Sequence, residues 1–119
     1  QTIMMKDSLH MTAADRRRIL AACRRAPEKR IVITHGTDTM AETAAVLGRG
    51  LANKTVVLTG AMRPYRFGSS DGLFNLGSAI SFAQILPSGV YISMNGRLFP
   101  WDDVRMDRRL GIFRRRGTQ

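Results

Sequence analysis

The chain alternates short apolar runs with longer segments of helical periodicity, and this alternation constrains its fold more than any other feature. The short runs are rich in β-branched residues, too short for helices and bounded by turn signals, as buried strands are. They lie at residues 2–5, 31–33, 55–58 and 90–94, with a further short apolar segment at 98–101. Helical patterns occupy the intervals, at about 13–25, 40–52 and 72–86. This order predicts an α/β fold with a mostly parallel sheet and helices on both faces, because right-handed crossovers cover each side of such a sheet.

Capping signatures place the starts of the three helices. Thr12 is followed three residues later by Asp15, and Thr39 is followed three residues later by Glu42. Both spacings are typical of a capping box, so a helix is expected to begin directly after each threonine. The pair Ser70–Asp71 offers N-caps for the third helix in the same way.

The segments that follow the strands are expected to meet at one edge of the sheet, since parallel strands end on the same side. These segments are Asp7-Ser8, residues 35–39, residues 60–68 and the turn dipeptide Asn95-Gly96. In open α/β sheets, ligands bind outside the carboxyl ends of the strands. The sequence therefore predicts a single crevice lined by these four segments.

Thr37 and Asp38 are the candidate chemical groups of this crevice, beside the free N–H groups of a helix start. A carboxylate can hold a substrate ammonium group, and a hydroxyl can orient a water molecule or relay a proton. The alternative is that Asp38 and Thr39 only cap the following helix, and the local pattern alone favours that alternative. His35 is more often a structural residue in this position, and Ser70 and Asp71 are interpreted as helix caps.

The length of 119 residues fits one domain, and the net charge of +10 raises the question of a nucleic-acid partner. The arginines cluster at residues 16–18, 24–25, 108–109 and 114–116. We favour a solvated helix face and a basic tail, because charge runs are usually solvated surface. Residues 1–104 are therefore assigned to the α/β domain, and residues 105–119, which show no clear period, to a basic C-terminal tail.

Other sequence features narrow the compartment and the ligand classes. The single cysteine, Cys23, excludes an internal disulfide and fits a reducing, cytoplasmic compartment; its apolar surroundings favour a core residue over a nucleophile. No apolar run approaches the length of a membrane span and no signal peptide is visible. Dinucleotide and Walker A motifs are absent, as are CxxC and HExxH spacings, so neither a cofactor nor a metal is expected. The chain opens at Gln1 inside an expected strand, which suggests that an N-terminal segment precedes it.

The segment His35-Gly-Thr-Asp-Thr39, followed by Met40-Ala-Glu-Thr-Ala44, resembles the second signature of the bacterial-type L-asparaginases. Similar segments follow one another in the order of that family over most of the chain, namely Asp7-Ser8, Val57–Pro64, Ser70–Leu76 and Met94–Asp102. The last of them is similar to the short, single-domain asparaginase-like proteins. The resemblance implies a Rossmann-like fold of the asparaginase N-terminal domain type, without a cofactor.

The resemblance also implies a function, the hydrolysis of L-asparagine, or a related side-chain amide, to aspartate and ammonia. Thr37 and Asp38 match the family's catalytic threonine and aspartate, and Asp38 also matches the residue that holds the substrate's α-amino group. Ser8 matches the serine that contacts the α-carboxylate. The family's use of a neighbouring subunit implies a homo-oligomer.

Three departures from the family pattern leave other functions open. The Thr-Gly-Gly motif that carries the family's first nucleophile does not occur in the chain, Leu9 replaces a polar contact, and Met106 stands where the family has a lysine. Arg105 cannot act as a base because its pKa is too high, and Lys54 is expected at the far end of its strand. The alternatives are a non-catalytic amino-acid-binding module and a subunit of a tRNA-dependent amidotransferase, in which the arginine clusters would have a role.

Overall fold

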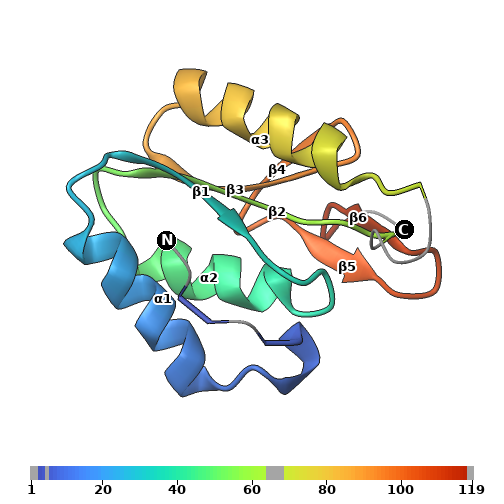
Figure 1. Cartoon of the computed structure of the whole chain (residues 1–119), viewed down its shortest axis with the longest axis horizontal. Coiled ribbons are helices and arrows are strands. Elements are labelled where there is room, and N and C mark those ends of the chain that lie inside the picture. Colours follow the sequence, from blue (N-terminus) through green and yellow to red (C-terminus); the bar gives the residue numbers. More distant parts are fainter. Residues whose placement is uncertain (1–2, 5, 64–68, 118–119) are drawn as a thin grey trace.

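The computed structural model describes residues 3–4, 6–63 and 69–117 (Figure 1). The alternation of strands and helices predicted for the middle of the chain is confirmed, and the three predicted α-helices begin at the predicted residues, whereas the short 3-10 helix η1 was not predicted. In chain order the elements are η1 (Ser8–His10), α1 (Ala13–Arg25), β1 (Arg30–Thr34), α2 (Met40–Gly50), β2 (Thr55–Thr59), α3 (Gly72–Ile85), β3 (Gly89–Met94), β4 (Arg97–Pro100), β5 (Arg105–Asp107) and β6 (Ile112–Arg114).

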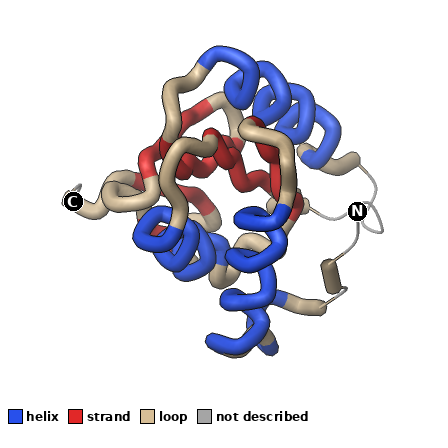
Figure 2. The backbone as a smooth tube through the Cα atoms, turned by 90° about the vertical axis from the view of Figure 1, so that its left-hand side faces the viewer, coloured by secondary structure: helices blue, strands red, loops and turns tan. Residues whose placement is uncertain are grey.

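The main sheet has the strand order β1-β2-β3-β4, in which the first three strands run parallel and β4 is antiparallel to β3. Figure 2 shows the strands between α3 on one side and α1 and α2 on the other. The prediction of a mostly parallel sheet with helices on both faces is therefore confirmed. Asn95 and Gly96 join β3 to β4 with φ values of 51° and 81°, which fits the predicted tight turn because type I′ hairpin turns require positive φ at both central residues.

The central strand β2 is buried along its whole length, and its side chains alternate between two hydrophobic clusters. Val56 and Leu58 belong to the cluster that includes buried side chains of α1 and α2, whereas Val57 packs with Ala79 and Ala83 of α3. This arrangement follows from the two-residue period of a strand, which sends successive side chains to opposite faces. A strand covered on both faces reads as a continuous apolar run, as β2 does.

Helix α1 begins with the predicted capping box. The Asp15 backbone N–H donates to Thr12 Oγ1 over 3.2 Å, and the Thr12 N–H donates to Asp15 Oδ2 over 2.9 Å. The Lys6 ammonium donates to the same carboxylate over 2.6 Å, and this bond and the box lower the pKa of Asp15 to about 2. Cys23, on the same helix, lies in the core, where burial raises the pKa of its thiol.

The strand expected at residues 2–5 is not formed by its described members, Ile3 and Met4; Thr2 and Met5 lie outside the described residues. Ile3 and Met4 instead pack against the main hydrophobic cluster. The carbonyl oxygen of Ile3 accepts a hydrogen bond from the Arg18 guanidinium over 3.3 Å, so a side chain of α1 takes the place of a strand partner.

The segment assigned to a basic tail forms a hairpin over residues 105–114, in which β5 pairs antiparallel with β6. Phe113 is buried and pairs with Met106, which packs against the main core. The Asp107 carboxylate holds the hairpin by accepting from the Arg114 guanidinium over 3.1 Å and from the Leu110 N–H over 3.1 Å. Two strands of three residues, in which Phe113 is the one buried side chain, give too few repeats for a periodic pattern, so the sequence did not reveal them.

Candidate functional site

The carboxyl ends of β1 and β2 lie in close contact, as the predicted crevice requires. The His35 N–H donates to the carbonyl oxygen of Thr59 over 2.9 Å. A Cβ atom on Gly60 would lie 2.2 Å from the His35 carbonyl oxygen, so only glycine allows this approach. The loop after β1 and the loop after β2 are therefore packed backbone to backbone.

Ser8 lies against the loop that follows β1. The Thr39 N–H donates to Ser8 Oγ over 3.3 Å, and Thr39 Oγ1 donates to the Ser8 carbonyl oxygen over 2.8 Å. A Cβ atom on Gly36 would lie 2.9 Å from Ser8 Oγ, which shows how closely the two segments approach. Ser8 is 2% exposed, so the predicted substrate contact is buried beneath the loop in this structure.

The capping box predicted for Thr39 and Glu42 is wrong, although α2 begins at the predicted residue. Thr39 is the N-cap residue, but its side chain makes no cap hydrogen bond. Its hydroxyl bonds Ser8 instead, because the turn containing Ser8 supplies a carbonyl acceptor that the local sequence pattern does not contain. A tertiary contact has replaced a local one at this helix start.

Thr37 and Asp38 are half-buried in the same loop, between β1 and α2. Within the described part of the chain, neither the Thr37 hydroxyl nor the Asp38 carboxylate has a hydrogen-bond partner, so Asp38 does not cap α2. The Asp38 carbonyl oxygen accepts a hydrogen bond from the Arg108 guanidinium over 3.2 Å, which connects the loop to the β5–β6 hairpin. The donors and acceptors of both side chains are thus not engaged by the described residues.

His35 is part of a chain of hydrogen bonds that begins on α1. The Arg16 Nε donates to Thr43 Oγ1 over 3.0 Å, and this oxygen lies 2.8 Å from His35 Nε2. The other ring nitrogen lies 2.7 Å from the carbonyl oxygen of Gly36, so His35 Nδ1 is the protonated donor and Thr43 donates to Nε2. Burial lowers the pKa of His35, which favours this neutral form. The ring therefore fixes the loop, as expected of a structural histidine.

Asp71 joins the loop after β2 to the turn after β3, a role that the sequence did not reveal. Its carboxylate accepts hydrogen bonds from the backbone N–H groups of Met62 (3.1 Å) and Arg63 (3.0 Å) and from the side chains of Asn75 and Asn95 (both 2.9 Å). Burial opposes ionisation of Asp71, but these hydrogen bonds prevail and lower its pKa to about 2.

Asp71 is the N-cap residue of α3, as predicted from the sequence, but its side chain makes no cap hydrogen bond to the helix. Ser70 does act at this helix start, where its Oγ accepts from the Gly72 N–H over 3.0 Å. The partners of Asp71 lie up to 24 residues away in the sequence, so a local pattern could not identify them.

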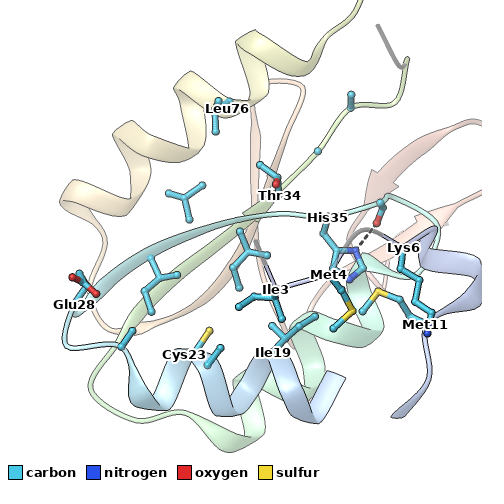
Figure 3. A pocket seen from close by; sticks show the side chains of 18 of the residues that line it. Ile3, Met4, Lys6, Met11, Ile19, Cys23, Glu28, Thr34, His35 and Leu76 are labelled. Carbon is cyan, nitrogen blue, oxygen red and sulfur yellow. Dashed lines mark hydrogen bonds between the residues drawn. The ribbon is translucent and has the colours of Figure 1, made fainter. Parts of the chain in front are cut away.

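An apolar groove of 1090 Å³ runs along the outer edge of β1, between α1 and the start of α3 (Figure 3). It reaches the candidate site at His35 and Gly36, but Ser8, Thr37 and Asp38 are not among the residues that line it. Strand β1 pairs only with β2 among the described strands, so the groove lies beside an unpaired strand edge. Its apolar lining includes Ile3, Met4, Ile19, Ile31, Ile33 and Leu76.

Neither Met106 nor Lys54 supplies a base at the site in place of the family's lysine. Met106 pairs with Phe113 and packs against the core. The Lys54 ammonium donates to the carbonyl oxygens of Cys23 (2.7 Å), Ala26 and Glu28 (2.9 Å), and so caps the end of α1. Since Lys54 precedes β2, it lies at the opposite end of the strand from the site, as predicted.

Over the ranges that the structure describes, no three His, Cys, Asp or Glu side chains are grouped so that they could hold a metal ion. None of the helices in those ranges is long and apolar enough to cross a membrane.

Comparison with known proteins gives a consistent result. The family model "Asparaginase, N-terminal" matches residues 1–109. The glutaminase-asparaginase of Acinetobacter glutaminasificans is 45% identical over 78 residues, which cover 62% of this chain and 24% of that protein. L-asparaginase 2 of Escherichia coli is 47% identical over 77 residues, or 61% of this chain and 22% of the relative. The probable periplasmic L-asparaginase of Haemophilus influenzae also shows 47% identity over 77 residues, with the same two coverages. The chain thus matches about a quarter of the length of these relatives.

Proposed function

Because the chain belongs to the asparaginase family, whose N-terminal domain matches residues 1–109, we propose that it forms part of an amidohydrolase that converts L-asparagine to aspartate and ammonia. The observation that carries this proposal is the position of Thr37 and Asp38 and the lack of hydrogen bonds from their side chains to other described residues. They lie together at the carboxyl edge of a parallel sheet, and neither polar side chain is bonded by another described residue. Ligands bind at this edge in open α/β sheets. A related side-chain amide is a second substrate, since one relative's name includes glutaminase as well as asparaginase.

In this proposal the Asp38 carboxylate binds the α-ammonium group of the amino acid, because opposite charges and three ammonium donors fit a free carboxylate. The Thr37 hydroxyl orients the attacking group or relays its proton. The Ser8 hydroxyl hydrogen is not used in either bond to Thr39, so it remains a donor for the substrate's α-carboxylate. Binding through Ser8 requires the loop of residues 36–39 to move, since Ser8 is covered by it.

The nucleophile is proposed to come from a strand outside this chain that pairs with the outer edge of β1. An unpaired strand edge accepts a further strand, and the adjoining apolar groove offers room for its side chains. A strand added parallel to β1 would end beside residues 35–39, where the resemblance places a threonine of a Thr-Gly-Gly motif. The low coverage of the relatives is consistent with a longer functional protein.

A non-catalytic amino-acid-binding module is the second candidate, favoured by the replacement of the family's lysine with Met106, a core residue. A role in binding RNA receives less support, because several clustered arginines are engaged within the chain. Arg16 bonds Thr43, Arg24 bonds the Gly50 carbonyl oxygen and Arg115 bonds Asp103. We further propose that the protein is cytoplasmic, that it is a homo-oligomer and that it needs no cofactor.

The test uses a protein in which a Thr-Gly-Gly strand, as in the family, is placed before this chain. Ammonia release from L-asparagine and calorimetric binding of L-aspartate are measured for the wild type and for the Thr37→Ala and Asp38→Ala variants. Turnover should be abolished in both variants, with aspartate binding lost mainly in Asp38→Ala. Thr37→Ser should recover part of the turnover, because it restores the hydroxyl.

Asp102→Ala is the matched control for Asp38→Ala, since it removes an exposed carboxylate outside the candidate site. Aspartate binding without ammonia release by the wild type would establish the binding module instead. Normal turnover in both Thr37→Ala and Asp38→Ala would refute the proposed site.

A further inference from the structure

The start of α3 contains a polar junction that joins backbone segments far apart in the sequence. Asn75 is fully buried there, and its amide group makes three hydrogen bonds. Its Nδ2 donates to the Gly60 carbonyl oxygen over 2.8 Å and to Asp71 Oδ2 over 2.9 Å, and its Oδ1 accepts from the Asn95 N–H over 2.9 Å. One side chain thereby holds both the loop after β2 and the turn after β3.

The Asp71 carboxylate completes this junction, and every described group that bonds it is a donor. Its Oδ1 accepts from the Arg63 N–H. Its Oδ2 accepts from the Met62 N–H and from the Nδ2 groups of Asn75 and Asn95. An asparagine at this position would turn its NH₂ group toward at least one of these donors in either orientation of its amide. The junction therefore requires an ionised carboxylate, which agrees with the lowered pKa of Asp71.

The backbone held by this junction touches the loop that contains Thr37 and Asp38. Gly60 approaches that loop so closely that a Cβ atom on it would lie 2.2 Å from the His35 carbonyl oxygen. The His35 N–H also donates to the Thr59 carbonyl oxygen over 2.9 Å. Because close-packed interiors transmit strain, a shift of Gly60 would be passed to His35 and to the residues that follow it.

We propose that Asp71 and Asn75 are positioning residues of the candidate site, which hold the loop after β2 where it supports the placement of Thr37. This role rests on the proposed function, in which the Thr37 hydroxyl orients the attacking group or relays its proton. Misplacing a reacting group by about 1 Å can lower a rate about 100-fold. Binding of the amino acid by Ser8 and Asp38 should depend less on the junction, because neither residue bonds a described residue of the loop after β2.

Kinetics and calorimetry test this role in a protein in which a Thr-Gly-Gly strand is placed before the chain. Asp71→Asn and Asn75→Ala should each lower kcat for L-asparagine at least tenfold, whereas the affinity for L-aspartate should change less than threefold. Gly48→Ala is the matched control for lost stability, since it disturbs the contact of α2 with Trp101 on the other side of the sheet from α3 (Figure 2). It should keep the wild-type kcat, and circular dichroism verifies that each variant is folded.

Hydrogen exchange of the full 119-residue chain gives a second readout, which does not depend on turnover. The His35 amide should exchange at least tenfold faster in Asp71→Asn than in the wild type, measured relative to the Val57 amide in the middle of β2. An unchanged His35 amide would overturn the proposed positioning role.

The two readouts separate failure of this role from failure of the proposed function. Wild-type kcat values in both Asp71→Asn and Asn75→Ala would overturn the positioning role and leave the amidohydrolase activity intact. A wild type that releases no ammonia would refute the proposed function, and the exchange of the His35 amide would then decide whether the junction fixes the loop.

Discussion

Thr39 Oγ1 donates a hydrogen bond to the carbonyl oxygen of Ser8 over 2.8 Å, which joins residues 31 positions apart in the sequence. The bond attaches the turn containing Ser8 to the residue at which α2 begins. It therefore fixes the serine relative to the loop that contains Thr37 and Asp38. The geometry of the candidate site depends on this contact.

Thr39→Val should lower the free energy of unfolding by about 0.5–1.5 kcal/mol, because it retains the shape of the side chain but removes one of the two donors to the Ser8 carbonyl oxygen and leaves only the Met11 N–H. Urea denaturation measures this change. Thr37→Val is the control, since the Thr37 hydroxyl bonds no described residue, and it should change stability by less than about 0.5 kcal/mol. Equal effects of the two substitutions would show that the Ser8 contact does not stabilise the fold.

Asp71→Asn should reduce the pH dependence of stability between about pH 4 and pH 2. The pKa of Asp71 is lowered from 3.8 to about 2 in the folded protein, so its contribution is complete above the unfolded pKa and is lost as pH falls through the folded pKa. Asp15 titrates in the same range and should leave part of the slope in the variant. Urea midpoints measured from pH 6 to pH 2 test this. An unchanged slope in Asp71→Asn would contradict the prediction.

Arg108→Ala should weaken aspartate binding about two- to fivefold, because the loop then loses the hydrogen bond at the Asp38 carbonyl oxygen. Stability should hardly change, since the bond is exposed to solvent. Arg109→Ala removes the same charge from the neighbouring exposed position and should bind aspartate as the wild type does. If the affinity for aspartate depended only on net charge, calorimetry would show the same loss of affinity in both variants, which would contradict the prediction.

Gly48→Ala should destabilise the chain by about 1–3 kcal/mol, because a Cβ atom there would lie 2.2 Å from the Trp101 ring. Gly77→Ala is the matched substitution on another helix, where a Cβ atom would meet nothing within 4 Å. Removing that glycine should stabilise the helix by about 0.5–1 kcal/mol. Thermal unfolding of both variants distinguishes the two effects, and a stabilising Gly48→Ala would show that the Trp101 contact is not tight.

Met106→Lys should raise asparaginase turnover of a protein that also contains the Thr-Gly-Gly strand, since the resemblance places a lysine at this position. The aliphatic part of lysine can keep much of the packing against the core, while its ammonium group reaches outward. Met106→Leu preserves the apolar character and should leave kcat unchanged. If both variants had the wild-type kcat, the alignment of Met106 with the family's lysine would lose its functional meaning.

The fold could be predicted well where the determining contacts are local. The capping box of Thr12 and Asp15 involves residues three apart, and the turn at Asn95 and Gly96 depends on the conformational freedom of those two residues. Thr39 showed the same spacing as Thr12, yet its hydroxyl bonds Ser8. The sequence pattern could not distinguish the two cases because the competing acceptor lies in a distant segment.

The candidate site was predicted in outline and not in detail. The convergence of the segments after the strands followed from the parallel order, and the freedom of Asp38 from capping could only be seen in three dimensions. The N-cap position of Asp71 could be predicted, but the partners of its carboxylate, among them Met62 and Asn95, could not, because they become neighbours only when the sheet forms. The roles of Ser8, Thr37 and Asp38 in binding and catalysis remain predictions.

The outer edge of β1 also bears on the colloidal behaviour of the isolated chain. Unpaired strand edges seed intermolecular sheets, and this edge adjoins an apolar groove. The net positive charge keeps molecules apart at low ionic strength, and salt weakens that repulsion within a Debye length of about 10 Å at 0.1 M. Solubility of the isolated chain should therefore decrease as salt is added. A strand paired with the outer edge of β1 would prevent this association by occupying the edge.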